Sequence, residues 1–330
     1  MRMRQSPLLS IVITSYTIDR LKDIYELLDS IRAQTYTNIE VIFVVERSTE
    51  LRERIKKYAK DEAIANITVA FNDRQPGQSP ARNLGVTYTK GDIIAFVDDD
   101  VTLFADWAEE MVNTYQDDSI IGVTGPAFPL WEDESMSWLP EEFHWIISCS
   151  GWSDWRDIRQ VRQAGGMNMS FRKEAFSYCS FSEDFGHIAQ EGRKVGPIVD
   201  DAEFSINLRL RTGKLIMYNP SVRVQHKVYK YRLSRRFIRG QAYWQGYSKF
   251  LLRRTYTNDT ETKALVREHI LLKRILFSLI PRTIAGFIND PMLAWKRLTV
   301  TVLALFYVTL GYSAAALPWL TGFTKERFSS

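Results

Sequence analysis

The sequence predicts an α/β fold in which helices cover a mostly parallel sheet. Apolar, β-branched segments alternate with segments whose apolar residues recur at helical spacing, four times in the first hundred residues. Residues 39–45 form an almost unbroken apolar run, which is typical of a strand buried on both faces. The expected strands of this half are Leu9–Ser15, Ile39–Val45, Ile67–Phe71 and Ile93–Val97.

The helices between these strands follow from apolar spacing and from residues that begin or end helices. Leu21, Ile24, Leu28 and Ile31 mark the first helix, and Leu51, Ile55, Tyr58 and Ala59 mark the second. A third helix is expected to begin with Ser79 as its cap and Pro80 at its first position, and to end at Lys90-Gly91 with a left-handed glycine.

The second half of the chain has a mixed pattern. Short strands are expected at Ile120–Val123, Asn168–Arg172, Leu215–Tyr218 and Val222–Gln225. A helix over Ala202–Arg211 is expected to close at Gly213.

Composition excludes several classes of protein. The chain has 330 residues, of which 45% are hydrophobic and 25% charged, so it is not mainly disordered. A net charge of +4 is too small to indicate nucleic acid binding. Two cysteines are too few for a disulfide scaffold or a tetrahedral zinc site. Residues 223–254 hold ten Lys/Arg and no acid, which indicates a solvated face or one that meets phosphates or an anionic membrane.

The C-terminal region is predicted to associate with a membrane. Leu298–Leu320 carries no charge and is long enough to cross a bilayer, although an interfacial helix is the rival interpretation. Ala264–Phe287 has the pattern of an amphipathic helix broken at Pro281, with Lys273 and Arg274 on its polar face. The N-terminus has no pattern of a signal peptide.

Polar residues follow the predicted strands where ligands bind in such sheets. They are Thr14 to Tyr16, Glu46, and Asp98 to Asp100. Alternate residues of an extended segment point the same way, so Asp98 and Asp100 can share one ion while Asp99 points elsewhere, toward a nucleotide ribose. Carboxylate oxygens suit Mg²⁺ or Mn²⁺, which also bind phosphate oxygens.

These segments, taken in order, resemble the family-two glycosyltransferases, whose fold is called GT-A. The similar segments are Ser10–Tyr16, Ile39–Ile42, Ala81–Gly85, Lys90–Asp100, Asn168–Arg172, Asp200–Glu203 and Leu208–Arg211. The resemblance implies an inverting enzyme that uses a divalent metal (Mn²⁺ or Mg²⁺) and a UDP-sugar as donor.

The resemblance also implies a role for individual residues. Glu46, in Val45-Glu46-Arg47-Ser48 where the family usually has Asp-Asp-Gly-Ser, would bind the uracil ring. Thr14 and Tyr16 would line the donor site. Arg82 and Asn83, expected just inside a helix N-terminus, would approach the diphosphate. Asp201 would be the general base and Asp200 would contact acceptor or sugar. His226 would be a third metal ligand.

Two further segments resemble archaeal members that act on dolichol-phosphate-linked sugars, some of which transfer glucuronic acid. They are Trp138–Glu142 and Trp145–Cys149. The resemblance implies a lipid-linked acceptor (polyprenyl or dolichyl phosphate) at the cytoplasmic face of the cell membrane. Arg156, Arg159 and Arg162 are candidate partners of a glucuronate carboxylate.

The expected organisation is a catalytic domain over residues 1–255, with a nucleotide-sugar half (1–118) and an acceptor half (119–255), followed by membrane-associated helices over 256–330. Arg239, Gln241, Trp244 and Gln245 partly resemble a cluster of processive synthases, and an amphipathic helix near lipid headgroups explains them equally well. A processive polysaccharide synthase, an inactive membrane scaffold and a nucleotidyltransferase are the alternative functions.

Overall fold

The computed structural model describes residues 6–151, 155–183, 188–190, 193–256 and 266–320. The chain divides into two compact units. The first comprises residues 1–128, 154–196 and 200–227, and the second comprises 129–153, 197–199 and 228–330. The predicted boundary after residue 255 therefore falls inside the second unit.

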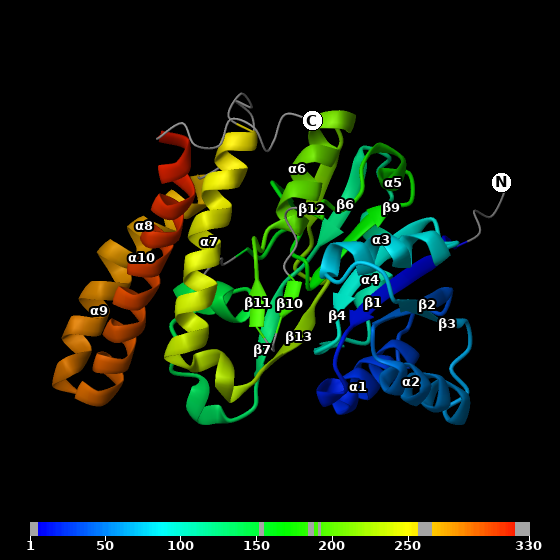
Figure 1. Ribbon diagram of the computed structural model, residues 1–330, viewed down its shortest axis with the longest axis horizontal. Coiled ribbons are helices and arrows are strands. Elements are labelled where there is room, and N and C mark those ends of the chain that lie inside the picture. The colour runs from blue at the N-terminus through cyan, green and yellow to red at the C-terminus, as the bar shows by residue number, and fades with distance from the viewer. Residues whose placement is uncertain (1–5, 152–154, 184–187, 191–192, 257–265, 321–330) are drawn as a thin grey trace. The chain divides into compact units, whose positions relative to one another are not determined.

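The first unit contains an eight-stranded sheet (Figure 1). Its strands are β1 (Leu9–Ser15), β2 (Ile39–Glu46), β3 (Ile67–Asn72), β4 (Ile93–Asp98), β6 (Ile120–Thr124), β8 (Arg159–Val161), β9 (Asn168–Arg172) and β12 (Leu215–Tyr218). The order is β3-β2-β1-β4-β9-β6-β12-β8. Strands β3, β2, β1 and β4 are parallel, whereas β9 is antiparallel to both of its neighbours. The predicted mostly parallel α/β sheet is confirmed.

Helices cover both faces of this sheet. They are α1 (Leu21–Arg32), α2 (Thr49–Asp61), α3 (Gln78–Tyr88), α4 (Trp107–Thr114), α5 (Ala175–Tyr178) and α6 (Asp200–Thr212). Successive strand residues face opposite ways, so Leu9, Ile11 and Ile13 join one core with residues of α1, α2 and α4. Val12 joins the other core, which contains residues of α3, α5 and α6.

Two smaller sheets complete the strands. β5 (Val101–Leu103) pairs antiparallel with β13 (Val224–Val228), and β7 (Ala127–Trp131) joins their sheet where the chain passes from the first unit to the second. β10 (Ile188–Gln190) and β11 (Arg193–Val195) form an antiparallel pair. The predicted strand at Val222–Gln225 begins two residues later than expected and extends to Val228.

Two predictions about α3 were wrong. The helix begins at Gln78 with Gly77 as its cap at φ 134°, so Ser79 and Pro80 lie inside the first turn. The Glu46 carboxylate accepts a hydrogen bond from the Gly77 N–H at 2.7 Å, which fixes this earlier start. At the other end the helix stops at Tyr88, and Gly91 has no positive φ. Gly91 is required instead because a Cβ there would lie 2.5 Å from Ser10 Oγ and 2.6 Å from the Leu8 carbonyl.

The second unit is helical. Its described helices are the 3₁₀ segments Glu134–Met136, Glu141–Ile147 and Lys230–Leu233, then α7 (Arg235–Thr255), α8 (Val266–Arg274), a π-helical turn (Ile275–Leu279), α9 (Ile280–Ala285), a 3₁₀ turn (Gly286–Ile288) and α10 (Pro291–Leu320). Their core contains Phe143, Ile146, Ile238, Leu279 and Val300.

Proline 281 does not break the helical segment, contrary to the prediction. The π-helical turn before it places the Ile280 N–H on the Ile275 carbonyl, and Pro281 then lies in the first turn of α9, where a missing N–H is tolerated.

Arg274 also differs from its predicted place on a polar outer face. It pairs with the buried Glu142 at 3.0 Å, and Arg282 pairs with the same carboxylate at 2.9 Å. Residues 257–265 and 321–330 of the predicted C-terminal region lie outside the described residues.

Candidate active site

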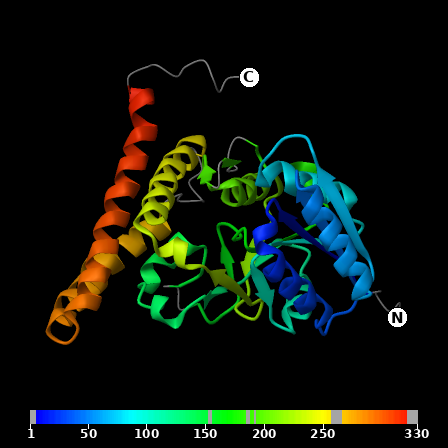
Figure 2. The ribbon, with the colours of Figure 1, turned by 60° about the horizontal axis from the view of Figure 1, so that its bottom comes forward.

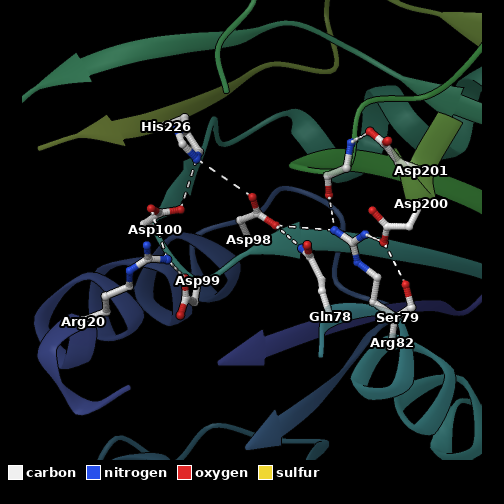
Figure 3. A network of polar contacts seen from close by, with 11 residues as sticks. Arg20, Gln78, Ser79, Arg82, Asp98, Asp99, Asp100, Asp200, Asp201 and His226 are labelled. Atoms are coloured by element: carbon white, nitrogen blue, oxygen red, sulfur yellow. Dashed lines mark hydrogen bonds and ion pairs between the residues drawn. The ribbon is translucent and has the colours of Figure 1, made fainter. Parts of the chain in front are cut away.

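The three aspartates lie at the carboxyl end of β4, with Asp98 as its last residue, and the fold adds a histidine to them (Figure 3). Strand β13 pairs with β5 so that His226 lies opposite Val101, directly after Asp100. The Lys227 N–H also bonds to the Asp100 carbonyl at 2.9 Å. His226 Nε2 consequently lies 3.2 Å from Asp100 Oδ1 and 4.0 Å from Asp98 Oδ2.

The cluster of Asp98, Asp100 and His226 fits a divalent cation. One ligand atom from each residue lies within 4.8 Å of the other two. Asp100 and His226 are almost completely buried, while Asp98 retains some exposure. The two carboxylates suit Mn²⁺ or Mg²⁺, and the imidazole nitrogen suits Mg²⁺ less well, because Mg²⁺ prefers oxygen ligands. The identity of the ion stays a prediction.

Asp99 points away from this cluster, as the alternation of an extended segment requires. It forms an ion pair with Arg20, which also lies 3.3 Å from Asp100 Oδ2. Burial raises the pKa of Asp99, and the Arg20 guanidinium acts in the opposite direction. The Asp99 carboxylate is buried against this arginine. Its predicted contact with a ribose stays a prediction.

Arg82 connects the aspartates after β4 with those that open α6. Its guanidinium lies 2.8 Å from Asp200 Oδ2 and 3.6 Å from Asp98 Oδ1, and only 3% of the residue is exposed. Ser79 Oγ donates to Asp200 at 3.3 Å, and Gln78 Nε2 donates to Asp98 at 3.3 Å. Because α3 begins at Gln78, Arg82 acts through its side chain from the second turn and not from the helix N-terminus.

Asp201 is held at the same place by backbone groups. Its Oδ2 accepts the Gly166 N–H at 2.8 Å and its Oδ1 accepts the Ala202 N–H at 2.7 Å. Burial and the neighbouring Asp200 raise the pKa of Asp201 to about 6, although Arg82 and the two N–H groups favour the ionised form. A carboxylate with this pKa is ionised at neutral pH and remains basic enough to accept a proton.

The other predicted donor-site residues lie around the carboxyl ends of β1 and β2. Glu46 ends β2 with its carboxylate on the Gly77 N–H, and Tyr16 is exposed just after β1. Thr14 is partly buried at the position of β1 that pairs with Asp98. Asn83 differs from expectation, because both ends of its amide bond to the backbone of Phe181, at 2.8 and 2.9 Å. That pairing gives Asn83 a structural partner in the second turn of α3, and its diphosphate contact stays a prediction.

Three residues that shape this site were not predicted from the sequence to belong to it. Arg20 neutralises the buried acids, Ser79 supports Asp200, and Gly166 bonds to both Arg82 and Asp201, with its carbonyl 3.1 Å from Arg82 Nη2. The adjacent glycines Gly165-Gly166, directly before the strand at Asn168, were a usable signal, since paired glycines mark a close backbone approach.

Comparison with known proteins agrees with this fold. Solved structures with the same fold include a mannosyltransferase PcManGT from Pyrobaculum calidifontis in complex with GDP-Man and Mn²⁺, with a TM-score of 0.59 and 16% identity, covering 93% of this chain and 88% of that one. Another is GalNAc-T7 with UDP, GalNAc and Mn²⁺, with a TM-score of 0.54 and 15% identity, covering 84% of this chain and 58% of that one. The fold is therefore GT-A, whose relatives bind nucleotide sugars and Mn²⁺, and the protein is a glycosyltransferase.

Residues 10–176 match the model described as Glycosyl transferase family 2, and the chain belongs to that family. It is similar over almost its whole length to the glucosyl-dolichyl phosphate glucuronosyltransferase of Haloferax volcanii. The two are 28% identical over 306 residues, which cover 92% of this chain and 94% of that relative.

Proposed function

We propose that this glycosyltransferase moves a sugar, glucuronic acid or a hexose, from a UDP-sugar to a dolichyl-phosphate-linked saccharide, with inversion at the anomeric carbon. The observation that carries the proposal is the arrangement of Asp98, Asp100 and His226 beside Asp200 and Asp201, with Arg82 between the two groups. Similarity to the Haloferax enzyme over nearly the whole chain supports the choice of substrates.

The residues divide the chemistry between them. Asp98, Asp100 and His226 would hold the divalent cation, which when bound would stabilise the negative charge of the leaving diphosphate. Asp201 would take the proton of the acceptor hydroxyl as its oxygen attacks the anomeric carbon. Arg82 would orient Asp200 and approach the donor phosphates.

A lipid-linked acceptor is consistent with the composition of the C-terminal helices. Among the described residues, one helical segment, Pro291–Pro318, is long and apolar enough to cross a membrane. Association with the cytoplasmic face of the cell membrane would bring the enzyme to the lipid acceptor and to soluble donors. A processive polysaccharide synthase, the alternative function, would instead transfer sugars repeatedly to one product.

The test is transfer to purified dolichyl phosphate glucose, with UDP-glucuronate and UDP-glucose compared as donors and products identified by mass spectrometry. We expect one added sugar, loss of activity after EDTA treatment, and recovery with Mn²⁺ or Mg²⁺. Asp201→Asn is expected to abolish transfer, whereas the exposed Asp73→Asn serves as the matched control. A ladder of products would favour a processive synthase, and no transfer with any donor would favour a scaffold.

The choice of glucuronic acid as the transferred sugar depends on a further hypothesis about Arg159. Arg159 lies beside Trp155, with its guanidinium carbon 5.4 Å from the ring centroid, and its carboxylate partner Asp157 is 3.8 Å away. This weak ion pair leaves Arg159 able to exchange Asp157 for the carboxylate of glucuronate. Arg159→Ala is expected to lower turnover with UDP-glucuronate much more than with UDP-glucose, and equal losses would contradict the hypothesis.

A further inference from the structure

The C-terminal helices of the second unit expose many large apolar side chains. On α10 it consists of Met292, Trp295, Val302, Phe306, Leu310 and Leu317, which we call the apolar stripe. These residues recur at helical spacing along one face, from the first turn of α10 to its last. Two further apolar side chains are exposed before α10: Ile288, which is 87% exposed, and Phe277 in the π-helical turn, which is 79% exposed. A row of exposed apolar side chains of this length marks an interaction site.

The opposite face of α10 is fixed to the body of the second unit. Ala294, Val300, Ala304 and Ala315 are buried, and Val300 and Ala304 belong to the core of the unit. Arg297 Nε donates to the Trp138 carbonyl at 3.2 Å. The helix is therefore anchored from its first turn to the region of Ala315, and it cannot enter a bilayer lengthwise unless the surrounding elements enter with it.

The tightest of these contacts joins α10 to α7, which run side by side in both views (Figures 1 and 2). A Cβ on Gly246 would overlap the Val308 carbonyl, and a Cβ on Gly311 would overlap the Tyr243 carbonyl, so the two backbones touch. Arg253 reinforces the pair by donating to the Tyr312 hydroxyl at 2.9 Å.

Helix α7 is too polar to accompany α10 across a membrane. It carries six Lys/Arg and no acid, and Arg239 and Lys249 lie in its interior turns. Arg239 packs over the Tyr307 ring, within the segment of α10 that a spanning helix would place in hydrocarbon. Charged side chains at the centre of a bilayer are strongly unfavourable.

The charge around the stripe identifies its partner as an anionic lipid surface. Between His269 and Leu320 there are five Lys/Arg and a single acid, Asp290, and two of the five, Arg274 and Arg282, share Glu142 as their ion-pair partner. Lys273 and Lys296 are exposed on either side of the most exposed apolar residues, where they can reach lipid phosphates while the apolar side chains enter the acyl boundary.

From these observations we infer that α10 lies in the plane of one leaflet, with its apolar stripe in lipid and its other face on α7, and does not cross the membrane. The in-plane position of α10 specifies how the enzyme proposed above would associate with a membrane. It rests on the proposed function only for the identity of the acceptor. It is tested without donor or acceptor, so its failure and a failure of sugar transfer are distinguishable.

The first experiment measures binding of the full chain to vesicles of phosphatidylcholine with and without phosphatidylglycerol. We expect binding to the anionic vesicles, weakened more than about tenfold by Ile288→Asp combined with Met292→Asp, because two apolar side chains leave the lipid. Ile158→Asp, which changes a residue of the first unit that is 56% exposed, is the matched control and should bind normally. Circular dichroism checks that all variants are folded.

Unchanged vesicle binding by the double variant would overturn the inference. Self-association that disappears with the same substitutions, together with an absence of vesicle binding, would also overturn it, because the stripe would then cover a second copy of the chain.

The second experiment distinguishes an in-plane helix from a spanning one. Ser6→Cys and Ser330→Cys are combined in a chain whose Cys149 and Cys179 are replaced by alanine, and the protein is reconstituted into sealed vesicles. A membrane-impermeant maleimide is added and each molecule is weighed intact. We expect molecules with two labels or none, because both termini lie on one side. Molecules with a single label would show that α10 spans the bilayer and would overturn the inference.

Discussion

The ionisation of Asp201 is expected to set the acidic limit of the reaction. With a pKa of about 6, close to 90% of this carboxyl is ionised at pH 7 and about 10% at pH 5. A base must be ionised to accept a proton, so kcat/KM should fall about tenfold across this interval. With the ordinary pKa near 3.8, the loss of activity across this interval would be only about 6%.

The raised pKa of Asp201 also affects the stability of the fold, in the direction opposite to its effect on activity. Folding raises the pKa of Asp201, so the folded state favours the protonated carboxyl. The stability that this group contributes is present below about pH 4 and is lost as the pH rises through about 6. Activity and this part of the stability should therefore change in opposite directions over one pH range.

The assay is kcat/KM for the donor at saturating divalent cation, measured from pH 5 to pH 8. Repeating it at several cation concentrations separates the titration of Asp201 from pH effects on cation binding. Asp200→Asn removes the negative charge that raises the pKa of Asp201, so it should move the midpoint to lower pH. A midpoint near pH 4 in the unmodified enzyme, or no movement in this variant, would refute the assignment of Asp201 as base.

Three further predictions follow from the site. Asp98→Asn and His226→Ala should each raise the Mn²⁺ concentration for half-saturation more than about tenfold by calorimetric titration, and unchanged binding in either would remove that residue from the cluster. Arg20→Met leaves two buried carboxylates without their arginine and should lower the free energy of unfolding in urea by about 3–5 kcal/mol, a loss that added Mn²⁺ partly restores; a loss below about 1 kcal/mol would contradict this role. Gly166→Ala places a Cβ 3.1 Å from an arginine nitrogen and 3.3 Å from a carboxylate oxygen, so kcat/KM should fall at least about tenfold with little change in melting temperature. Gly240→Ala, where no atom lies within 4 Å, is its control and should leave activity unchanged and raise stability by about 0.5–1 kcal/mol; similar activity in both glycine variants would count against a precise Gly166 contact.

The sheet was predictable from the sequence because its strands carry a strong local signal. Apolar runs such as Ile93–Val97 indicate buried strands. The direction of the chain along a parallel strand then places the following aspartates at the ligand-binding edge of the sheet. Helix boundaries were less predictable where a tertiary contact decides them. Ser79-Pro80 is a good local start signal, but Glu46 binds the Gly77 N–H and begins the helix earlier.

The partners of the site residues were the part that the sequence could not supply. Arg20 is 79 residues from Asp99, and Arg82 is 118 residues from Asp200, so neither pairing has a local signal. Asn83 shows the same limit, since its amide matches a backbone segment almost a hundred residues away. Residue type and strand position indicate that a side chain is near the site, but only the fold determines which neighbour it contacts.

The shared guanidinium of Arg82 has a consequence for how the enzyme would be loaded. Five carboxylates meet two arginines in the described site, which leaves three uncompensated negative charges when all the acids are ionised. The carboxylates are Asp98, Asp99, Asp100, Asp200 and Asp201, and the arginines are Arg20 and Arg82. A diphosphate that arrives without a cation meets net repulsion at short range, where the low dielectric of a buried site makes charge costly. Donor affinity should therefore depend steeply on the divalent cation even in a variant that cannot transfer sugar. Arg82 and the acids around it would then set the order of binding, with the cation entering before the donor or together with it.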